Sequence, residues 1–370
     1  MGNKTFSAKR VWTSKGWKHN AKVTVQDGII TEISEGQGEC DIPILIPGMV
    51  ELHAHGSLAY NSAEPTEEKN EEWLKRLARH GVTAILPTLS SHSPEQICRA
   101  VEFYSGVMNS PVKGGARVLG VHLEGPFLNL DKKGGINPNY IREPSIEHYK
   151  ELIGDHPEAV KQITVAPELS GADELITYLK EQGVKVNAGH TNATAEEMRH
   201  GIELGVDGVT HFFNAARPIS HRDPGLLTEA LLTDSVFLEM VSDLVHLAPE
   251  IIKLMVKCAG ARRISIVTDA VTYSGMPDGH YERCVVVDGS PRLENGTLTG
   301  GRYLTDGCVK ALLGIGLDPY DVIQMASNTP ARRLGVEDIG DIAPSMRADL
   351  VAMDENYNIL FTAIDGELTE

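Results

Sequence analysis

Cysteine is scarce in this sequence and forms no recognisable pairing pattern. The chain has five cysteines, an odd number, and none of them stands in Cys-x-x-Cys spacing. Their positions are Cys40, Cys98, Cys258, Cys284 and Cys308. This scatter gives no sign of a disulfide framework or a zinc ribbon, and it is typical of reduced thiols. We therefore expect a cytoplasmic protein.

Long hydrophobic runs are absent as well. The apolar stretches are strand-sized, whereas a helix that spans a bilayer needs about 20 apolar residues. The first ten residues, from Met1 to Arg10, contain no apolar segment of the kind that a secretory signal requires. We therefore expect no secretion and no membrane partner.

Positive charge is in deficit. The 34 lysines and arginines stand against 51 aspartates and glutamates, which gives a formal net charge of −17. This balance disfavours nucleic acid and anionic membranes as partners. It leaves an anionic small molecule possible, because a local group of Arg and His side chains, or a bound metal, overrides the field of the whole chain.

What the sequence does contain is a regular alternation of strand and helix patterns. Apolar runs begin near residues 49, 83, 117, 162, 184, 207, 236 and 263. Helical patterns lie between them over residues 67–80, 94–108, 146–154, 173–182, 194–205 and 249–259, and two closing helices are expected at 306–313 and 319–327. Alternating elements predict a parallel sheet, and eight units predict closure into an α/β fold of the (β/α)8 TIM-barrel type.

The two ends of the chain have a different sequence pattern from the middle. Both are rich in short strand patterns, and Asp27-Gly28 is a hairpin signal between two of them. We predict a small β-sandwich domain formed by residues 1–48 plus 338–370, and a barrel domain over residues 49–337. Residues 271–300 are expected to leave the barrel as a hairpin excursion after the eighth strand.

Polar residues stand at the C-terminal ends of five of the apolar runs. They are His53 and His55, Glu124, His190, His211 and Asp269. Active sites of (β/α)8 barrels lie at this end of the strands and take residues from several strands. The pattern therefore predicts one shared site.

The residue types indicate a hydrolytic metal site. One Glu and two His that leave a position open, here Glu124, His190 and His211, form the ligand set of a catalytic Zn²⁺ or Fe²⁺. His53 and His55 are two apart on a strand, so their side chains share a face and can bind one metal. Each histidine taken alone can equally be a structural residue or be solvated and idle.

Asp269 follows the eighth apolar run in Val267-Thr-Asp-Ala. Beside a metal-bound water, it could take a proton from the attacking water and return it to the leaving group. The alternative is a plain helix N-cap or loop aspartate.

These motifs carry a family resemblance. The chain resembles the amidohydrolase superfamily and, within it, the N-acetylglucosamine-6-phosphate deacetylase family, over nearly its whole length. The matching strings include Pro47-Gly-Met-Val-Glu-Leu-His-Ala-His-Gly56, His122-Leu-Glu-Gly-Pro-Phe-Leu-Asn129, Thr210-His-Phe-Phe-Asn-Ala215 and Arg222-Asp-Pro-Gly225. The string that begins at His122 is highly specific to this deacetylase group.

The resemblance implies a role for each matching residue. Glu124, His190 and His211 match the main metal ligands, Asp269 matches the catalytic carboxylate, and His53 and His55 match a second metal site that some members have. One or two divalent metals per subunit are therefore implied. The remaining positions implied to contact the amino-sugar phosphate are Asn214, Ala215, Arg222, His246, Gly135, Ile136, Leu298, Thr299 and Gly300. Arg222 and His246 match the phosphate-binding pair, of which the neighbouring subunit of a homodimer usually donates one.

The sequence also departs from the family pattern. Ile136 stands where the family normally has a His that polarises the acetyl carbonyl, and losing one such donor typically costs about 100- to 1,000-fold in turnover. Leu244 replaces the glycine that usually follows the position of Asp243, which could reshape the phosphate loop. Leu298-Thr-Gly-Gly301 replaces a more usual Ala-Gly-Ser variant.

Three hypotheses follow. The leading one is metal-dependent deacetylation of N-acetylglucosamine 6-phosphate to glucosamine 6-phosphate and acetate. The second keeps the metal and Asp269 but changes the substrate to another N-acyl amino sugar, phosphorylated or not, or to an N-acyl amino acid. The third is a sugar-phosphate-binding protein that has lost catalysis.

Overall fold

A parallel eight-stranded barrel forms the larger part of the molecule. The computed structural model describes residues 3–36, 38–90, 92–282 and 284–369. In barrel order the strands are β5 (Met49–Ala54), β8 (Val82–Ser90), β10 (Val121–Glu124), β11 (Val160–Val165), β12 (Lys185–Ala188), β13 (Val206–Val209), β14 (Phe237–Val241) and β15 (Ile264–Val267). A short strand, β9 (Arg117–Val118), precedes β10 and also pairs with β8, so the third predicted run is divided in two.

Backbone contacts between the first and last strands close the barrel. The Asp269 N–H donates to the His53 carbonyl over 2.9 Å, and the His55 N–H donates to the Ala270 carbonyl over 2.7 Å. The predicted (β/α)8 architecture is therefore confirmed. The same two bonds place His53, His55 and Asp269 side by side at the C-terminal end of the barrel.

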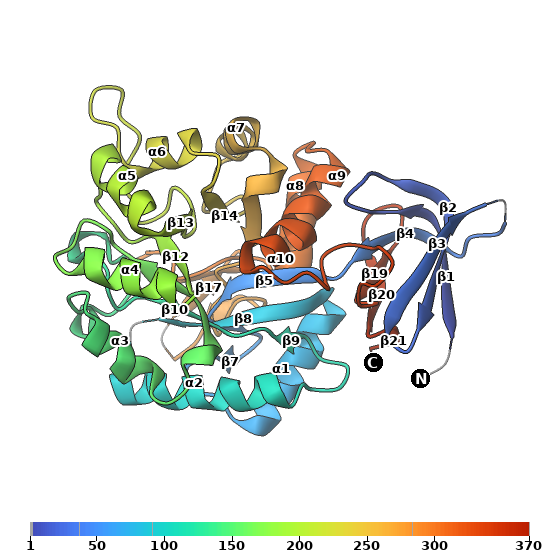
Figure 1. Ribbon diagram of the computed structural model, residues 1–370, viewed down its shortest axis with the longest axis horizontal. Coiled ribbons are helices and arrows are strands. Elements are labelled where there is room, and N and C mark those ends of the chain that lie inside the picture. Colours follow the sequence, from blue (N-terminus) through green and yellow to red (C-terminus); the bar gives the residue numbers. More distant parts are fainter. Residues whose placement is uncertain (1–2, 37, 91, 283, 370) are drawn as a thin grey trace.

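Helices cover the outside of the barrel (Figure 1). They are α1 (Glu67–Arg79), α2 (Pro94–Asn109), α3 (Ile146–Ile153), α4 (Ala172–Glu181), α5 (Ala195–Leu204), α6 (Leu226–Leu232), α7 (Pro249–Ala259), α8 (Thr305–Gly314), α9 (Pro319–Ile323) and α10 (Thr329–Leu334). Helix α5 begins with a capping box, in which Thr194 and Glu197 bind each other's backbone N–H groups.

Two helical features were not predicted. Helix α6 has only seven residues, too short for its apolar spacing to stand out. The closing helix expected at 319–327 ends as α9 at Ile323, and a π-helical turn over Gln324–Asn328 leads from it into α10.

The termini meet in one small β domain, which lies to the right of the barrel in Figure 1. Its strands follow the order β21 (Glu367–Leu368), β20 (Ile359–Ile364), β19 (Leu350–Met353), β4 (Ile42–Pro47), β1 (Lys4–Val11), β2 (Lys18–Gln26) and β3 (Ile29–Glu35). Hydrogen bonding joins them into one sheet. The sheet curls until Ile30 on β3 bonds Met346 and Ser345, and it thereby encloses an apolar core as a sandwich does. The exact division at residues 48/49 and 337/338 stays a prediction.

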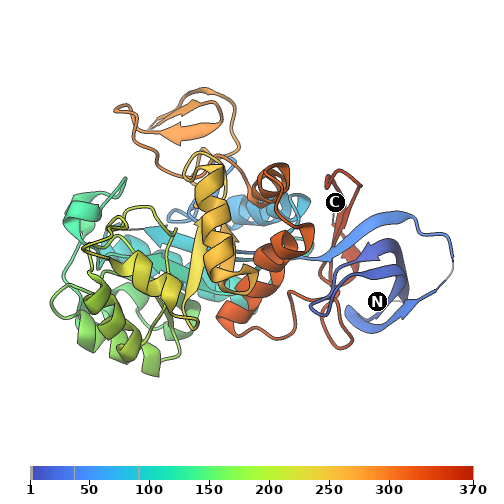
Figure 2. The ribbon, with the colours of Figure 1, turned by 90° about the horizontal axis from the view of Figure 1, so that it is seen from above.

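The predicted excursion after the eighth strand is a three-stranded sheet. Its strands are β16 (Gly279–His280), β17 (Val285–Val287) and β18 (Ser290–Arg292), paired antiparallel. Figure 2 shows this segment, in orange, standing away from the helical layer.

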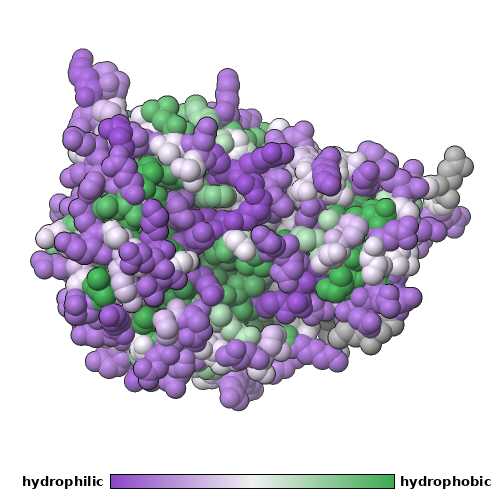
Figure 3. All heavy atoms as spheres, in the orientation of Figure 1, coloured by the Kyte–Doolittle hydropathy of each residue, from purple (hydrophilic) through white to green (hydrophobic). Residues whose placement is uncertain are grey.

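Hydrophilic side chains cover most of the face drawn in Figure 3, with hydrophobic residues in separate groups between them. In the described part of the chain, no helix has the length and apolar character that crossing a membrane requires.

The junction between the two sheets generates a stability prediction. Gly48 separates β4 from β5, and a Cβ at this position would lie 2.0 Å from the Oγ1 atom of Thr83, a buried side chain. Gly48→Ala is therefore expected to lower the free energy of unfolding by about 1–3 kcal/mol, because overpacking displaces the neighbouring strand. Urea unfolding followed by circular dichroism measures the change.

The matched control is Gly314→Ala, an exposed site on α8 where an added Cβ meets nothing within 4 Å. That substitution is expected to stabilise the protein slightly, by about 0.5–1 kcal/mol. If Gly48→Ala and Gly314→Ala changed the free energy of unfolding equally, the packing argument would be contradicted.

Candidate metal centre and cleft

A cleft of about 950 Å³ opens at the C-terminal ends of the barrel strands. Its volume lies within the range of small-molecule sites, which is about 300–1,000 Å³. The predicted residues His55, Glu124, His190, His211 and Asp269 all line it. The structure therefore brings the polar residues predicted at these strand ends together in a single cleft.

The first group of candidate ligands is Glu124, His190 and His211, and all three are buried. The Oε1 atom of Glu124 lies 3.1 Å from the Nε2 atom of His190 and 3.0 Å from that of His211. The two Nε2 atoms are 3.0 Å apart. Three ligand atoms from β10 and the ends of β12 and β13 therefore converge on one point.

The chemistry of this group fits a cation. The Nδ1–H of His190 donates to the Lys132 carbonyl over 2.8 Å, so in the neutral ring its Nε2 atom presents a lone pair toward Glu124. Two lone pairs that face each other at this distance require a proton or a metal between them. The spacings approach the roughly 3.3 Å that separates ligand atoms around a tetrahedral Zn²⁺ with bonds of about 2.0–2.1 Å.

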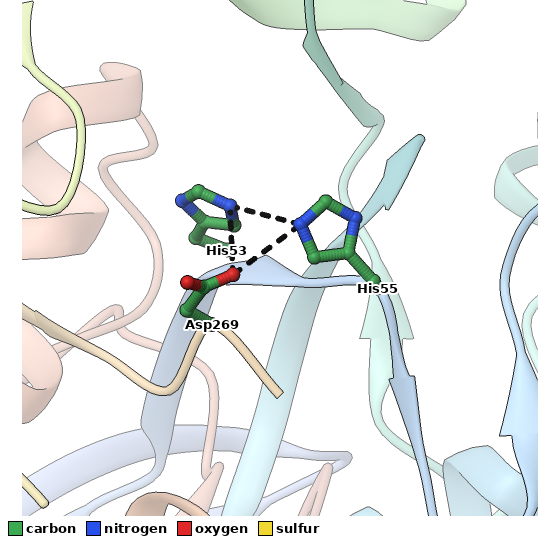
Figure 4. Close-up of side chains that lie close together, drawn as sticks. All are labelled: His53, His55 and Asp269. Carbon is green, nitrogen blue, oxygen red and sulfur yellow. Dashed lines mark hydrogen bonds and ion pairs between the residues drawn. The ribbon is translucent and has the colours of Figure 1, made fainter. Parts of the chain in front are cut away.

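The second group is His53, His55 and Asp269, whose side chains point toward one another in Figure 4. The His53 Nε2 atom lies 3.2 Å from the His55 Nε2 atom and 3.4 Å from the Asp269 Oδ1 atom. The His55 Nε2 atom is 3.2 Å from the Oε2 atom of Glu124. Glu124 therefore lies between the two groups and contacts both.

A carboxylate below the cleft orients His53. The His53 Nδ1 atom lies 2.9 Å from the Oε2 atom of Glu239, which is buried on β14. Glu239 also accepts hydrogen bonds from Gln162 and Asn187, at 2.7 and 2.8 Å. A carboxylate that holds one nitrogen of a histidine leaves the other free to bind a metal, which is the usual supporting arrangement in metal sites.

The electrostatics show an excess of negative charge at the cluster. Burial alone would lower the pKa of His53, but Glu124, Glu239 and Asp269 outweigh it and raise that pKa to about 10. The pKa of His55 rises to about 9 in the same way, against burial, through hydrogen bonds with Asp269 and Glu124. The cluster therefore attracts positive charge, as protons or as metal.

The backbone at the strand ends is strained. His190, His211 and Asp269 have φ values of 47°, 28° and 49°, in the left-handed region that non-glycine residues rarely adopt. Each conformation turns a side chain into the cleft directly after a strand. Strain of this kind concentrates at functional sites.

Most of the predicted substrate contacts also lie in the cleft. The lining includes Asn214, Ala215, His246, Gly135, Ile136, Leu298 and Thr299. Gly300 lies just behind them, where an added Cβ would be 2.6 Å from the Asp269 carbonyl oxygen. This glycine therefore lets the chain pack against the backbone of Asp269.

Arg222 does not line the cleft. It is exposed on the segment between β13 and α6. Within one chain the structure therefore does not bring together the phosphate pair, Arg222 and His246, that the resemblance implies.

The loop that carries His246 keeps a glycine-like shape although its glycine is replaced. Leu244 has a φ of 60°, so the backbone adopts the conformation that a glycine would favour. Asp243 accepts hydrogen bonds from the backbone N–H groups of Val245 and His246, and its Oδ2 atom lies 2.8 Å from the Nδ1 atom of His246. The Nε2 edge of His246 is thereby held toward the cleft.

Sequence reasoning missed several residues of the site, and two of them bear directly on its electrostatics. Glu239 supports His53, and its signal is a lone carboxylate within the apolar run Phe237-Leu-Glu-Met-Val. Arg292 lines the cleft from the end of β18, and no local pattern in the sequence distinguishes it from other surface arginines.

The comparisons with known proteins agree with this geometry. The family model described as Amidohydrolase family matches residues 44–369. An N-acetylgalactosamine-6-phosphate deacetylase of Escherichia coli O157:H7 is 32% identical over 98% of both chains, and an N-acetylglucosamine-6-phosphate deacetylase of Vibrio furnissii is 31% identical over 98% of this chain and 94% of its own.

Solved structures are similar over the full length. N-acetylglucosamine-6-phosphate deacetylase from Thermotoga maritima superposes with a TM-score of 0.91 at 32% identity and covers 99% of both chains. A mutant of the Mycobacterium smegmatis deacetylase, in complex with N-acetyl-D-glucosamine 6-phosphate, gives a TM-score of 0.94 at 27% identity over 100% of both chains.

The chain therefore belongs to the amidohydrolase family and, within it, to the N-acetylglucosamine-6-phosphate deacetylase family. With its clustered His, Glu and Asp side chains it is a metal-dependent amidohydrolase, and the family resemblance seen in the sequence is confirmed.

The Asp243–His246 pair generates a prediction on pH. Despite burial, hydrogen bonds with His246 lower the pKa of Asp243 to about 2, and Asp243 raises the pKa of His246 above its usual 6.5 although burial opposes this. Because its pKa is lowered on folding, Asp243 stabilises the folded state at pH values above 3.8, its usual pKa. Because its pKa is raised on folding, His246 stabilises the folded state at pH values below 6.5, its usual pKa. The pair therefore contributes most between these two values and less on either side.

We expect Asp243→Asn to lower the pKa of His246, and to cost the most unfolding free energy inside that pH window. An NMR titration of the imidazole resonances measures the pKa, and urea unfolding at several pH values measures the stability. Asp173→Asn is the control, because Asp173 raises the pKa of His200 in an exposed pair. An unchanged pKa of His246 in Asp243→Asn would contradict the assignment.

Proposed function

We propose that the protein hydrolyses the acetamide of N-acetylglucosamine 6-phosphate to glucosamine 6-phosphate and acetate. The observation that carries the proposal is the convergence of Glu124, His190 and His211 beside Asp269 in one cleft. A positioned carboxylate beside a metal site suits hydrolysis and is unnecessary for binding alone, which disfavours the non-catalytic alternative. The substrate of the Mycobacterium smegmatis complex and the names of the full-length relatives support the choice of amide.

In this proposal Glu124, His190 and His211 hold the main divalent metal. The donor set of one carboxylate and two imidazoles suits Zn²⁺ or Fe²⁺. His53 and His55 with Asp269 are the ligands of a second metal where one is bound. When bound, the metal lowers the pKa of a water molecule and polarises the carbonyl of the amide.

Asp269 is the proposed proton shuttle. It takes a proton from the water whose oxygen attacks the acetyl carbon, and it gives that proton to the amide nitrogen as the C–N bond breaks. The products are then acetate and a free amine. His53 and His55, within 3.4 and 3.3 Å of its Oδ1 atom, keep the carboxylate ionised by lowering its pKa, against burial.

The other lining residues position the substrate. Asn214 and Ala215 are proposed to contact the sugar, and His246 the phosphate. Ile136 lies where the family has its carbonyl-polarising histidine, and its side chain offers no hydrogen-bond donor to the acetyl carbonyl.

N-acetylgalactosamine 6-phosphate is the second candidate substrate. The relative from Escherichia coli O157:H7, 32% identical, is an N-acetylgalactosamine-6-phosphate deacetylase. The two sugars differ only in the orientation of one hydroxyl group. Other N-acyl amino sugars and N-acyl amino acids remain the broader alternative.

The assembly and location are also proposed. Because Arg222 is exposed outside its own cleft, we propose a homodimer in which this arginine reaches the phosphate of the neighbouring subunit. Five free thiols support a cytoplasmic location.

A substrate panel tests the reaction. Acetate release is measured on the metal-replete protein with the 6-phosphates of N-acetylglucosamine, N-acetylgalactosamine and N-acetylmannosamine, and with unphosphorylated N-acetylglucosamine. N-acetylglucosamine 6-phosphate is expected to give the highest kcat/KM. A higher kcat/KM for N-acetylgalactosamine 6-phosphate would favour that compound as the substrate. Release of acetate from none of the four would indicate another N-acyl substrate.

Two substitutions separate metal binding from proton transfer. Asp269→Asn is expected to lower kcat by about 100- to 10,000-fold, the usual contribution of a general acid–base, while the main metal stays bound. Glu124→Gln is expected to lose both metal and activity. Elemental analysis gives the metal content, and acetate release gives kcat. Full activity of Asp269→Asn would rule out its proposed role.

A further inference from the structure

The described lining of the cleft contains more carboxylates than lysine and arginine side chains, although the proposed substrate carries a phosphate. A sugar phosphate carries close to two negative charges at neutral pH. The cleft already contains the carboxylates of Glu64, Glu124 and Asp269. Among its described lining residues, Arg292 is the one arginine or lysine. It is therefore the permanent cation that the chain itself offers to an anionic ligand.

Arg292 is held in place by the excursion after the eighth strand. It ends β18, and the turn that follows returns the chain so that Arg292 pairs with Leu298. Its Nη1 atom donates to the Gly296 carbonyl over 3.0 Å. Within the ranges that the structure describes, no carboxylate forms an ion pair with this guanidinium, so its charge is available to a ligand.

Arg292 acts on the same part of the cleft as His246. Both side chains line the cleft, and the charge of Arg292, like burial, lowers the pKa of His246 against the effect of Asp243. Thr297 and Thr299, on the same turn, also line the cleft. A planar guanidinium, an imidazole and hydroxyl groups that line one cleft form a favourable set of donors for phosphate oxygens.

We propose that Arg292 binds the 6-phosphate together with His246 and makes the enzyme selective for phosphorylated over neutral amino sugars. The inference rests on the proposed function and deepens it. It gives each subunit a phosphate-binding arginine of its own, in addition to the Arg222 proposed to come from a neighbour. The excursion β16–β18 is then the element that recognises the phosphate.

The test compares Arg292→Gln and Arg292→Lys with the wild type on N-acetylglucosamine 6-phosphate and on unphosphorylated N-acetylglucosamine. Arg292→Gln is expected to raise KM for the phosphorylated sugar about 10- to 100-fold, as the loss of a charge-assisted hydrogen bond predicts. Its kcat, and its kcat/KM for the neutral sugar, are expected to stay within about threefold. Arg292→Lys keeps the positive charge but not the planar pair of guanidinium donors, and it is expected to recover part of the lost affinity for the phosphorylated sugar.

Arg199→Gln is the matched control, because Arg199 is an exposed arginine that pairs with Glu229 outside the cleft. It is expected to behave as wild type. Calorimetric binding of glucosamine 6-phosphate and of glucosamine, to wild type and Arg292→Gln, gives a readout that needs no turnover.

The outcomes are distinct. The proposal is supported if Arg292→Gln loses the phosphate preference, Arg292→Lys recovers part of it and Arg199→Gln retains it. An unchanged preference overturns it, and so does an equal loss on both sugars, which would indicate a structural role. If no N-acetyl sugar phosphate is hydrolysed but Arg292→Gln still loses its preference for glucosamine 6-phosphate, the proposed function fails and the phosphate assignment stands.

Discussion

The structure depends on a concentration of negative charge at one end of a closed barrel. Glu124, Glu239 and Asp269 lie within a few side chains of one another, and each has an imidazole nitrogen within 3.4 Å. Buried carboxylates at such distances are stable only with cations among them. The strained strand ends, the tautomer imposed on His190 by Lys132, and the support of His53 by Glu239 all maintain this arrangement. The barrel therefore holds a site that is complete only with bound positive charge.

Much of this site could be predicted from sequence because barrel geometry is regular. His53 and Glu124 lie at the C-terminal ends of their strands, and His190, His211 and Asp269 lie two residues after theirs. Parallel strands of a closed barrel bring their C-terminal ends together. Other features depend on tertiary contacts that no local pattern encodes. The left-handed conformation of Leu244 is fixed by Asp243 and its partners, and the entry of Arg292 into the cleft depends on how a hairpin folds back.

Recognition and chemistry occupy different parts of the chain. The cluster of candidate metal ligands is built from strand ends that share a hydrogen-bonded frame, whereas the proposed phosphate end of the cleft consists of the His246 loop and the excursion β16–β18. On this proposal, a substitution at a strand end would change the spacing of the ligands, and one in the excursion would change which molecule is bound. The departures from the family pattern at Ile136 and Leu244 lie outside the cluster, which keeps all of its residues.

The shared sheet of the two termini bears on how the chain is made. Strand β4 pairs with β1 on one side, but its other neighbour is β19, which follows the whole barrel in the sequence. At about 5–20 residues per second, the roughly 300 residues between them take about 15–60 s to synthesise. During that interval one edge of β4 has no strand partner while β5, joined to it through Gly48, is already available to the barrel. A chaperone that covers an open strand edge would therefore bind near β4, well before the last strand of the barrel has been synthesised.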